Sequence, residues 1–331
     1  MTTILKGNIV SAPACGRLDV TEHGYLIAEN GVITGVYPVL PEQYAGASVE
    51  DYGDCLIVQS FADLHLHAPQ YPMLGMGMDL PLLDWLNAYA FPTEARFAEP
   101  DYARTVYRQL AGELASHGTT RVCMFSSLHT DATLILMDEL EKAGITGYVG
   151  KVNMDRNGAP GVLEETTEES MRETLRWLDA CQDFRHIKPI LTPRFTPSCT
   201  NELMAWLGRT AAERNAKLIM VDPGKISDVR YGVEEQSFSY GEEKDIRIHL
   251  AGAYQIENAA LATEAVQGLR SLGFAISDDA FRRGMKKTVW RGRFTCIHKN
   301  PLVFMDGAHK DDAAKKLAAS IETFFPGKKL F

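Results

Sequence analysis

The first 57 residues alternate short apolar runs with turn residues. Residues 25–28 and 32–36 have the composition of strands, and Asn30-Gly31 between them is a dipeptide that favours a tight hairpin. This pattern predicts a small β-domain over residues 1–57.

From residue 58 onward the pattern changes to strands that alternate with longer helical segments. Apolar runs predict strands at 55–63, 119–125, 145–152 and 187–193. Apolar residues at helical spacing lie between them, at Tyr102, Val106, Leu110 and Leu114 in one segment and at Met171, Leu175 and Leu178 in another. This alternation predicts βα units around a parallel sheet, in which functional side chains gather at the carboxyl ends of the strands.

Near residue 210 the local pattern shows no boundary. A helical pattern runs from Glu202 to Arg214 and continues into an apolar run at 217–221, without a linker rich in Gly, Ser or Pro. Periodicity alone predicts a fifth barrel strand at 217–221, with Asp222 at its end.

Asp63-Leu64-His65-Leu66-His67 is the segment that points most directly to chemistry. Side chains alternate along a strand, so His65 and His67 point to the same side and can reach one cation. Neutral imidazole is a common ligand of zinc and iron. Taken alone, the pair fits a metal site and a partly exposed strand end equally well.

Composition favours small-molecule chemistry. The chain has 331 residues, 45% of them hydrophobic and 23% charged, and its net charge of -9 argues against a nucleic-acid partner. No apolar stretch is long enough for a membrane span, and the start of the chain lacks the pattern of a signal peptide. We therefore expect a cytoplasmic protein.

The cysteines are scattered and include no C-x-x-C pair. They are Cys15, Cys55, Cys123, Cys181, Cys199 and Cys296. We expect them to be reduced and mostly buried. The absence of a Pro-Cys-x-x-Cys segment also argues against the zinc deaminases that bind their metal through His and Cys.

Several motifs in order resemble the guanine deaminase branch of the amidohydrolase superfamily, over roughly residues 1–208. They are Asp63-Leu64-His65-Leu66-His67-Ala68-Pro69-Gln70, then Gly75-Met76-Gly77-Met78-Asp79-Leu80-Pro81, Phe91-Pro92-Thr93-Glu94, and Thr192-Pro193-Arg194-Phe195-Thr196-Pro197. The resemblance implies a (β/α)8 barrel with a small β-domain, and zinc-dependent hydrolysis of guanine to xanthine and ammonia.

The same resemblance implies roles for individual residues. His65 and His67 match metal ligands, while Gln70, Arg194 and Phe195 match residues that bind the purine. An arginine fork can donate to a ring carbonyl and nitrogen, and an aromatic ring can stack on the flat base. Without the resemblance, Arg194 and Phe195 fit a surface arginine and a core phenylalanine.

The second half of such a site has no counterpart in the sequence. The family also uses two more histidines, a glutamate and an aspartate from later strands. After His186 the chain contains only His249, His298 and His309, and none stands in the expected setting. Two imidazoles without these partners predict weak zinc binding and no general base.

From about residue 211 to the end, the chain resembles folylpolyglutamate synthase, a Mur-ligase-like ATP-dependent enzyme. The motifs are Leu250-Ala251-Gly252-Ala253-Tyr254-Gln255-Ile256-Glu257-Asn258-Ala259-Ala260, Trp290-Arg291-Gly292-Arg293-Phe294 and Phe304-Met305-Asp306-Gly307-Ala308-His309. This resemblance implies nucleotide contacts at Asn258, Arg293 and Asp306, with ATP and Mg²⁺ as cofactors and folate and glutamate as substrates. Lys310 stands where the last motif usually continues with asparagine.

Local features support this second resemblance in part. Asn258 lies at the start of a helical run, where the amide and the helix dipole favour an anion. Positive charge is concentrated at Arg282, Arg283, Lys286, Lys287, Arg291 and Arg293. This group suits phosphates or a polyglutamate tail, and it equally suits a solvated helix face. No G-x-x-x-x-G-K-[ST] phosphate loop occurs in the sequence.

The sequence thus predicts an α/β protein with three parts. They are a small β-domain (1–57), an incomplete TIM-like (β/α) barrel (58–209) and a partial Mur-ligase-type α/β domain (210–331). Three functions remain open: a guanine deaminase-like hydrolase impaired by its incomplete site, a folate ligase fragment, or an inactive fusion of the two. An open barrel also makes a homo-oligomer possible.

Overall fold

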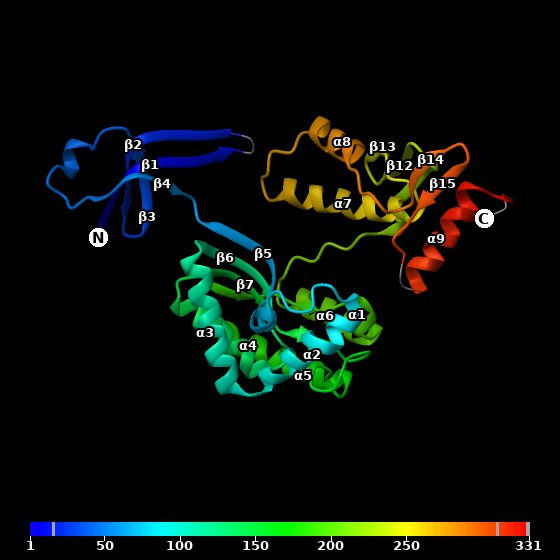
Figure 1. Cartoon of the computed structure of the whole chain (residues 1–331), viewed down its shortest axis with the longest axis horizontal. Coiled ribbons are helices and arrows are strands. Elements are labelled where there is room, and N and C mark those ends of the chain that lie inside the picture. The colour runs from blue at the N-terminus through cyan, green and yellow to red at the C-terminus, as the bar shows by residue number, and fades with distance from the viewer. Residues whose placement is uncertain (15–16, 309–310, 329–331) are drawn as a thin grey trace. The chain divides into compact units, whose positions relative to one another are not determined.

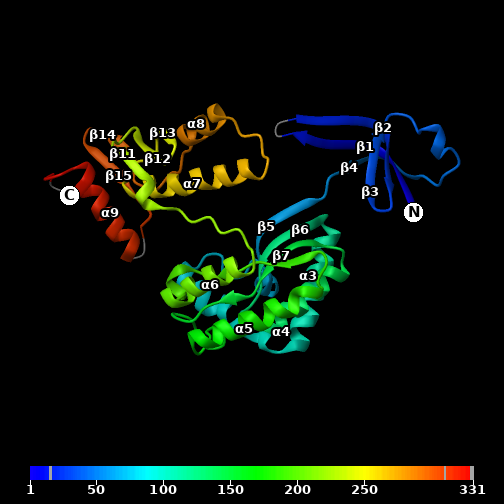
Figure 2. The same cartoon turned by 180° about the vertical axis from the view of Figure 1, so that it is seen from behind.

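The computed structural model describes residues 1–14, 17–308 and 311–328. The chain separates into two compact units, Met1–Arg214 and Asn215–Phe331, which Figures 1 and 2 show from opposite sides. This division lies near the domain boundary predicted after residue 209, and the boundaries of the three predicted parts stay predictions. Cys15, His309 and Lys310 lie outside the described residues.

The N-terminal segment forms a four-stranded sheet in the order β3-β2-β1-β4. Its strands are β1 (Thr2–Ala14), β2 (Arg17–Glu29), β3 (Val32–Tyr37) and β4 (Glu50–Val58). Asn30 and Gly31 have φ values of 52° and 81°, which gives the tight turn that joins β2 to β3. The strands and hairpin predicted from the pattern in this segment are confirmed.

A parallel sheet in the order β5-β6-β7-β9 forms the centre of the N-terminal unit. Its strands are β5 (Phe61–His67), β6 (Thr119–Phe125), β7 (Thr146–Gly150) and β9 (Ile187–Pro189), and a separate parallel pair joins β8 (Val152–Asn153) to β10 (Thr192–Pro193). The longer helices are α3 (Pro100–Ser116), α4 (Thr130–Lys142), α5 (Thr167–Ala180) and α6 (Asn201–Glu213), and short α1 (Leu82–Trp85) and α2 (Phe91–Ala95) precede them.

The core of this unit fills the space between the sheet and the helices. Val122 and Met124 of β6 are buried against Leu110 of α3 and Leu136 of α4. Trp177 of α5 is fully buried in the same cluster. The apolar positions that predicted the α3 helix thus face the sheet, and alternate residues of the strands are left on its other face.

Three of the predicted strands have different limits, whereas β6 has the predicted ones. The predicted strand 55–63 is two strands, because Ile57 and Val58 pair with Ile9 and Val10 of β1 and the chain then leaves that sheet. The predicted strand 187–193 is likewise divided into β9 and β10, and 145–152 ends at Gly150 before β8 begins. The predicted strand at 217–221 was wrong: this segment has no regular structure, and Met220 is 73% exposed.

The C-terminal unit contains an antiparallel sheet packed against two helices. Its elements are β11 (Ile226–Arg230), β12 (Gln236–Tyr240), β13 (Glu243–Ile248), α7 (Tyr254–Ser271), α8 (Asp278–Lys287), β14 (Thr295–Lys299), β15 (Leu302–Met305) and α9 (Asp311–Phe324). Phe238 and Ile246 of the sheet, Ile256 and Ala260 of α7 and Phe281 of α8 form its core. The chain is therefore an α/β protein, and the Mur-ligase type of this unit stays a prediction.

The cysteines in the described residues are free thiols, as expected, but fewer of them are buried than predicted. Cys181 and Cys199 are buried, whereas Cys55 is exposed. Burial raises the pKa of the Cys181 thiol to about 12, which keeps it protonated and unreactive. None of the helices in the described segments has the length and apolar character needed to cross a membrane.

We predict that G147A destabilises the N-terminal unit strongly. Gly147 of β7 has a φ of 141°, and a Cβ there would stand 1.9 Å from the carbonyl oxygen of Val122 in the neighbouring strand. We expect a loss on the order of 3 kcal/mol in the free energy of unfolding, measured by urea unfolding with circular dichroism. G112A in α3 is the matched control, since a Cβ there meets nothing within 4 Å. Equal midpoints for the two variants would contradict the prediction.

Candidate functional site

His65 and His67 lie at the carboxyl end of β5, on the strand itself. Their rings meet edge to face with centroids 5.2 Å apart, and the His67 ring stacks on Phe125 of β6 at 4.7 Å. The two imidazoles therefore share one face of the sheet, as the alternation of a strand requires. His65 is exposed and His67 is half-buried.

The surroundings of His67 disfavour its charged form. Burial is the main cause, the nearby charge of Arg194 adds to it, and Glu94 opposes both, so that the pKa of His67 is lowered to about 4. At neutral pH the ring is uncharged, which is the form that binds a metal or accepts a hydrogen bond.

A buried carboxylate joins two of the predicted site residues. Glu94 of α2 is 2% exposed, and its Oε1 accepts hydrogen bonds from Gln70 Nε2 at 3.0 Å and from Arg194 Nη2 at 3.0 Å. Its Oε2 accepts a second hydrogen bond from Arg194, through Nη1. Phe91, from the same turn of helix, lies against the guanidinium at 5.5 Å. The structure thus brings Gln70 and Arg194 together through a residue to which sequence analysis assigned no role.

Phe195 lies beside Arg194 in the chain, and its side chain is 48% exposed. Among the described residues, the groove of about 450 Å³ that His65, His67 and Gln70 line does not include Phe195. The predicted stacking of Phe195 on a base therefore stays a prediction. Asn153 at the end of β8 is buried, and its side chain donates hydrogen bonds to Ser170 and Thr174 of α5.

The residues at this strand end do not make a complete zinc site. Within 1–14, 17–308 and 311–328, no group of three or more His, Cys, Asp or Glu side chains is arranged to hold a metal ion. A catalytic zinc takes three protein ligands and a water. His65 and His67 supply two, so the donor set fits weak metal binding and does not fit a catalytic centre.

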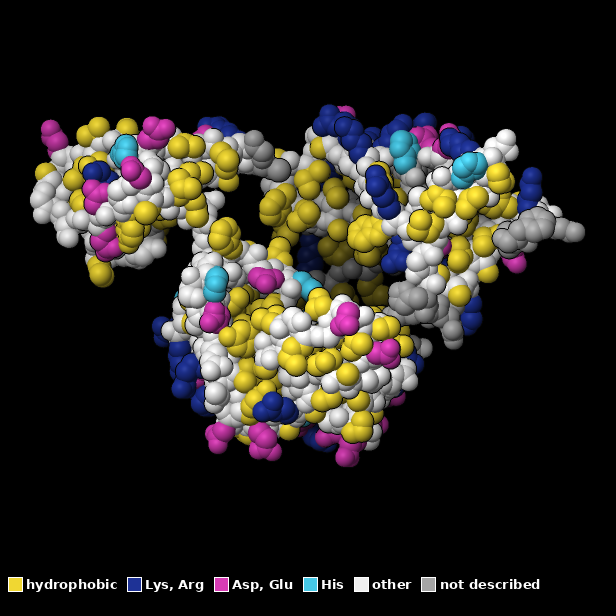
Figure 3. Space-filling model, viewed as in Figure 1, with side chains coloured by type: hydrophobic (Ala, Val, Ile, Leu, Met, Phe, Trp, Pro, Cys, Tyr) yellow, Lys and Arg dark blue, Asp and Glu magenta, His cyan; other side chains and the backbone are white. Residues whose placement is uncertain are grey.

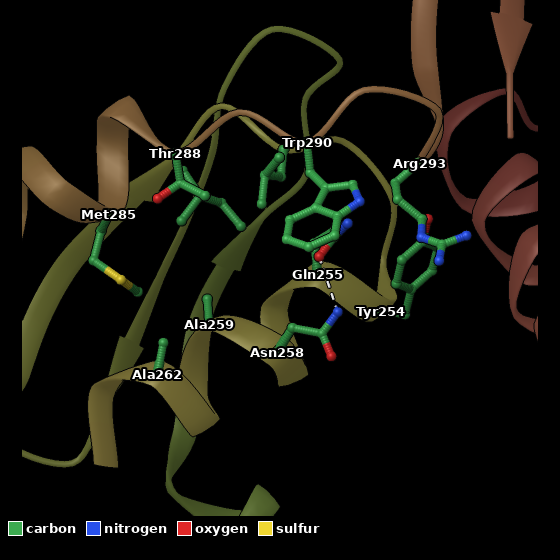
Figure 4. A pocket seen from close by; sticks show the side chains of 11 residues that line it. Tyr254, Gln255, Asn258, Ala259, Ala262, Met285, Thr288, Trp290 and Arg293 are labelled. Atoms are coloured by element: carbon green, nitrogen blue, oxygen red, sulfur yellow. Dashed lines mark hydrogen bonds between the residues drawn. The ribbon is translucent and has the colours of Figure 1, made fainter. Parts of the chain in front are cut away.

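In the C-terminal unit, Asn258 and Arg293 line a pocket of about 360 Å³ together with the exposed Trp290. Figure 4 shows the Trp290 indole beside Gln255 and Asn258 in this pocket. The helix α7 begins at Tyr254, so Asn258 lies one turn inside the helix. The prediction that Asn258 lies at the start of this helix was wrong. Its Nδ2 donates to Gln255 Oε1 at 2.9 Å, which leaves its carbonyl oxygen for another partner.

Asp306 lies at a second hollow of about 280 Å³, which Arg293 and Tyr254 also line. Asp306 accepts hydrogen bonds from Phe294 N at 2.6 Å, Tyr254 Oη at 3.1 Å and Ala308 N at 2.8 Å. Burial and this carboxylate raise the pKa of Tyr254 to about 12. Tyr254 and Arg293 belong to both hollows, so the three predicted nucleotide contacts lie near one another.

Lys and Arg side chains gather over α8 (Figure 3). Several of them are paired with acids: Arg282 with Glu243 at 3.6 Å, Arg283 with Asp279 at 2.6 Å and Lys286 with Glu235 at 3.1 Å. These pairs are largely solvent-exposed, which agrees with the hypothesis of a solvated helix face. Arg293 does not belong to α8 and lines the pocket instead.

Histidines at the end of a strand in a parallel βα sheet are typical of barrel hydrolases that bind metal at the strand ends. Residues 56–221, about half of the chain, match the model of the Amidohydrolase family. The chain belongs to this family.

Proteins similar to this chain include several guanine deaminases. The guanine deaminase of Rattus norvegicus is 48% identical over 151 residues, which are 45% of this chain and 33% of that protein. The guanine deaminase of Dictyostelium discoideum is 41% identical over 230 residues, covering 64% of this chain and 51% of that protein.

Among solved structures, the guanine deaminase of C. acetobutylicum with guanine bound in its active site has a TM-score of 0.62 and 40% identity. The match covers 65% of this chain and 52% of that one. The chain thus spans between a third and about half of the length of these relatives.

We predict that His67 makes the stability of the metal-free protein depend on pH. Its pKa is lowered in the folded protein from 6.5 to about 4, so protonation favours the unfolded chain. Stability is retained above about pH 6.5 and decreases as the pH falls toward 4, by roughly 3 kcal/mol from this group. The test compares the free energy of unfolding in urea of the wild type and of H67N between pH 7 and 4. An NMR titration of the His67 ring measures its pKa directly. A midpoint near the ordinary value of 6.5 would contradict the burial described here.

Proposed function

We propose that the N-terminal unit recognises guanine through the site at the carboxyl end of β5. The similar proteins are named guanine deaminases. The reaction that corresponds to this site is the hydrolysis of guanine to xanthine and ammonia. The observation that carries this proposal is the group of Gln70, Arg194 and Glu94, joined by hydrogen bonds of 3.0 Å near the uncharged His67.

The chemistry of this group suits a flat purine. Arg194 keeps N–H donors that Glu94 does not use, and a guanidinium fork matches two neighbouring acceptors on a base. Gln70 adds an amide, and Phe195 supplies an exposed ring next to Arg194 on which a base can stack. His65 and His67 line the same groove as Gln70, so a base held by Gln70 lies within this groove.

We further propose that turnover in this chain is impaired. His65 and His67 are two ligands of a set that needs at least one more, and the described residues bring no third ligand to them. Glu94, the carboxylate joined to Gln70 and Arg194, is fully engaged by these two side chains, so it is not free to move a proton to the substrate. We therefore expect this chain to bind guanine without converting it.

The first prediction from this proposal concerns binding and turnover of the full chain. We expect guanine to bind measurably, zinc to bind at less than one equivalent at micromolar concentrations, and xanthine formation to stay at background. Isothermal titration, metal analysis and a xanthine oxidase-coupled assay measure the three quantities. Stoichiometric zinc together with turnover would refute the impaired site.

The variants R194M and Q70M locate the binding. Each should lower the affinity for guanine by on the order of 10-fold to 100-fold, because each removes a side chain that forms hydrogen bonds with the base. R104M is a matched control: Arg104 of α3 pairs with Glu139 of α4 at 3.3 Å and does not line the groove that His67 and Gln70 line. An equal effect of R104M would show that binding does not take place at this site.

The geometry of the C-terminal unit favours a second function, binding of a nucleotide such as ATP with Mg²⁺. We propose it because Asn258, Arg293 and Asp306 line two hollows that share Tyr254 and Arg293. The apolar pocket with Trp290 suits a base, and Arg293 suits a phosphate. Ligation of glutamate to a folate is not expected from this chain, since the sequence lacks the phosphate loop that stabilises phosphoryl transfer.

The nucleotide proposal predicts a fluorescence change at Trp290. MgATP should quench Trp290, which lines the pocket and is 65% exposed, and W290F should abolish this signal. R293M should weaken binding by about 10-fold or more, because it removes a charged partner of the phosphates. R283M, which breaks the exposed pair with Asp279, is the control and should bind as the wild type does. No change with MgATP up to millimolar concentration would end this proposal.

A further inference from the structure

Glu94 occupies an unusual position for a carboxylate near a ligand site, because it is fully engaged by the protein. Glu94 and Arg194 line a packed crevice together with Ser127, Leu128, Val152 and Val162. Both carboxylate oxygens of Glu94 accept hydrogen bonds from the side chains that were assigned to substrate binding, Gln70 and Arg194. With 2% of its surface exposed, Glu94 acts behind the site and reaches a ligand only through Gln70 and Arg194.

The charge of Glu94 decides which way the Gln70 amide points. An ionised carboxylate can only accept hydrogen bonds, so the partner at 3.0 Å from its Oε1 must be the amide nitrogen of Gln70 and not the amide oxygen. The carbonyl oxygen of Gln70 is then the end left for a ligand. A neutral partner at position 94 would allow either orientation of the amide.

The same carboxylate decides which donors of Arg194 remain. Glu94 takes one N–H from Nη1 and one from Nη2. The Nε–H and the outer N–H of the neighbouring nitrogen form a second fork, and Glu94 does not use it. The Phe91 ring, 5.5 Å from the guanidinium carbon, limits its rotation from one face. Arg194 therefore presents donors, whereas Gln70 presents an acceptor.

We propose that Glu94 is a positioning residue that fixes the hydrogen-bonding polarity of this site. Through Gln70 and Arg194 it selects a flat heterocycle that carries an acceptor beside a donor, such as the O6 and N1–H edge of guanine. A base with the opposite order, such as 2,6-diaminopurine with its 6-amino group and unprotonated N1, meets donor against donor and acceptor against acceptor. This inference rests on the proposed recognition of guanine.

The test compares the affinities of the full chain for guanine and for 2,6-diaminopurine, which have the same shape and the same 2-amino group. We expect the wild type to prefer guanine by on the order of 100-fold, since each mismatched polar contact is costly in a buried site. E94Q should reduce this preference to on the order of 10-fold, because the amide of Gln70 can then turn either way while Arg194 still presents only donors. E94D retains the charge and should keep most of the preference.

The ratio of the two affinities separates positioning from a general loss of structure. Partial unfolding lowers both apparent affinities by the same factor, so it leaves their ratio unchanged. E139Q is the matched control, since Glu139 is likewise buried, at 4% exposure, and is likewise paired with arginine, in this case Arg104 and Arg108. E139Q should keep the wild-type ratio. A wild-type ratio in a folded E94Q would overturn the proposal.

A second measurement keeps the role of Glu94 distinct from the recognition of guanine. The side-chain NH2 signals of Gln70, assigned by NMR with Q70M, should be protected from hydrogen exchange in the wild type and E94D and should lose this protection in E94Q. If the wild type binds neither base but shows this pattern, the proposed function fails and the positioning by Glu94 stands. If the wild-type NH2 group is unprotected, the positioning role is refuted.

Discussion

Burial of one face of the parallel sheet is the constraint on which the N-terminal unit depends. Val122, Met124 and Val149 turn toward α3, α4 and α5 and are withdrawn from water there. Because side chains alternate along a strand, this burial fixes the other face as well. His65 and His67 lie on that other face beside Phe125, so their proximity follows from the packing of residues that have no chemical role.

Each unit arranges its candidate site around a single carboxylate. Glu94 accepts hydrogen bonds from a guanidinium and an amide, and Asp306 accepts hydrogen bonds from a phenol and two backbone N–H groups. In both cases the acceptor is engaged by the protein, and at least one side chain bound to it lines an open hollow: Gln70 beside Glu94, and Tyr254 beside Asp306. A fixed acceptor of this kind costs little reorganisation when a ligand arrives, because the donors are already oriented.

The sequence predicted those parts of the structure that depend on neighbours in the chain. The limits of β6 and the hairpin at Asn30-Gly31 follow from local pattern and were predicted correctly. The break between β4 and β5 depends on pairing with β1, about fifty residues earlier, and periodicity contains no information about it. For the same reason the apolar run at 217–221 was wrongly predicted as a strand. Glu94 was missed although its motif was recognised, since its role depends on Gln70 and Arg194, which lie 24 and 100 residues away.

The separation of 100 residues between Glu94 and Arg194 has a consequence for how the protein folds. Closing a loop of this length costs conformational entropy before the ion pair can contribute any stabilisation. The chain must first assemble β6, β7 and β9, which carry it from one residue to the other. We therefore expect the order of events in folding to place the scaffold before the site, so that a chain interrupted or slowed between these residues has a formed sheet and an unformed binding group.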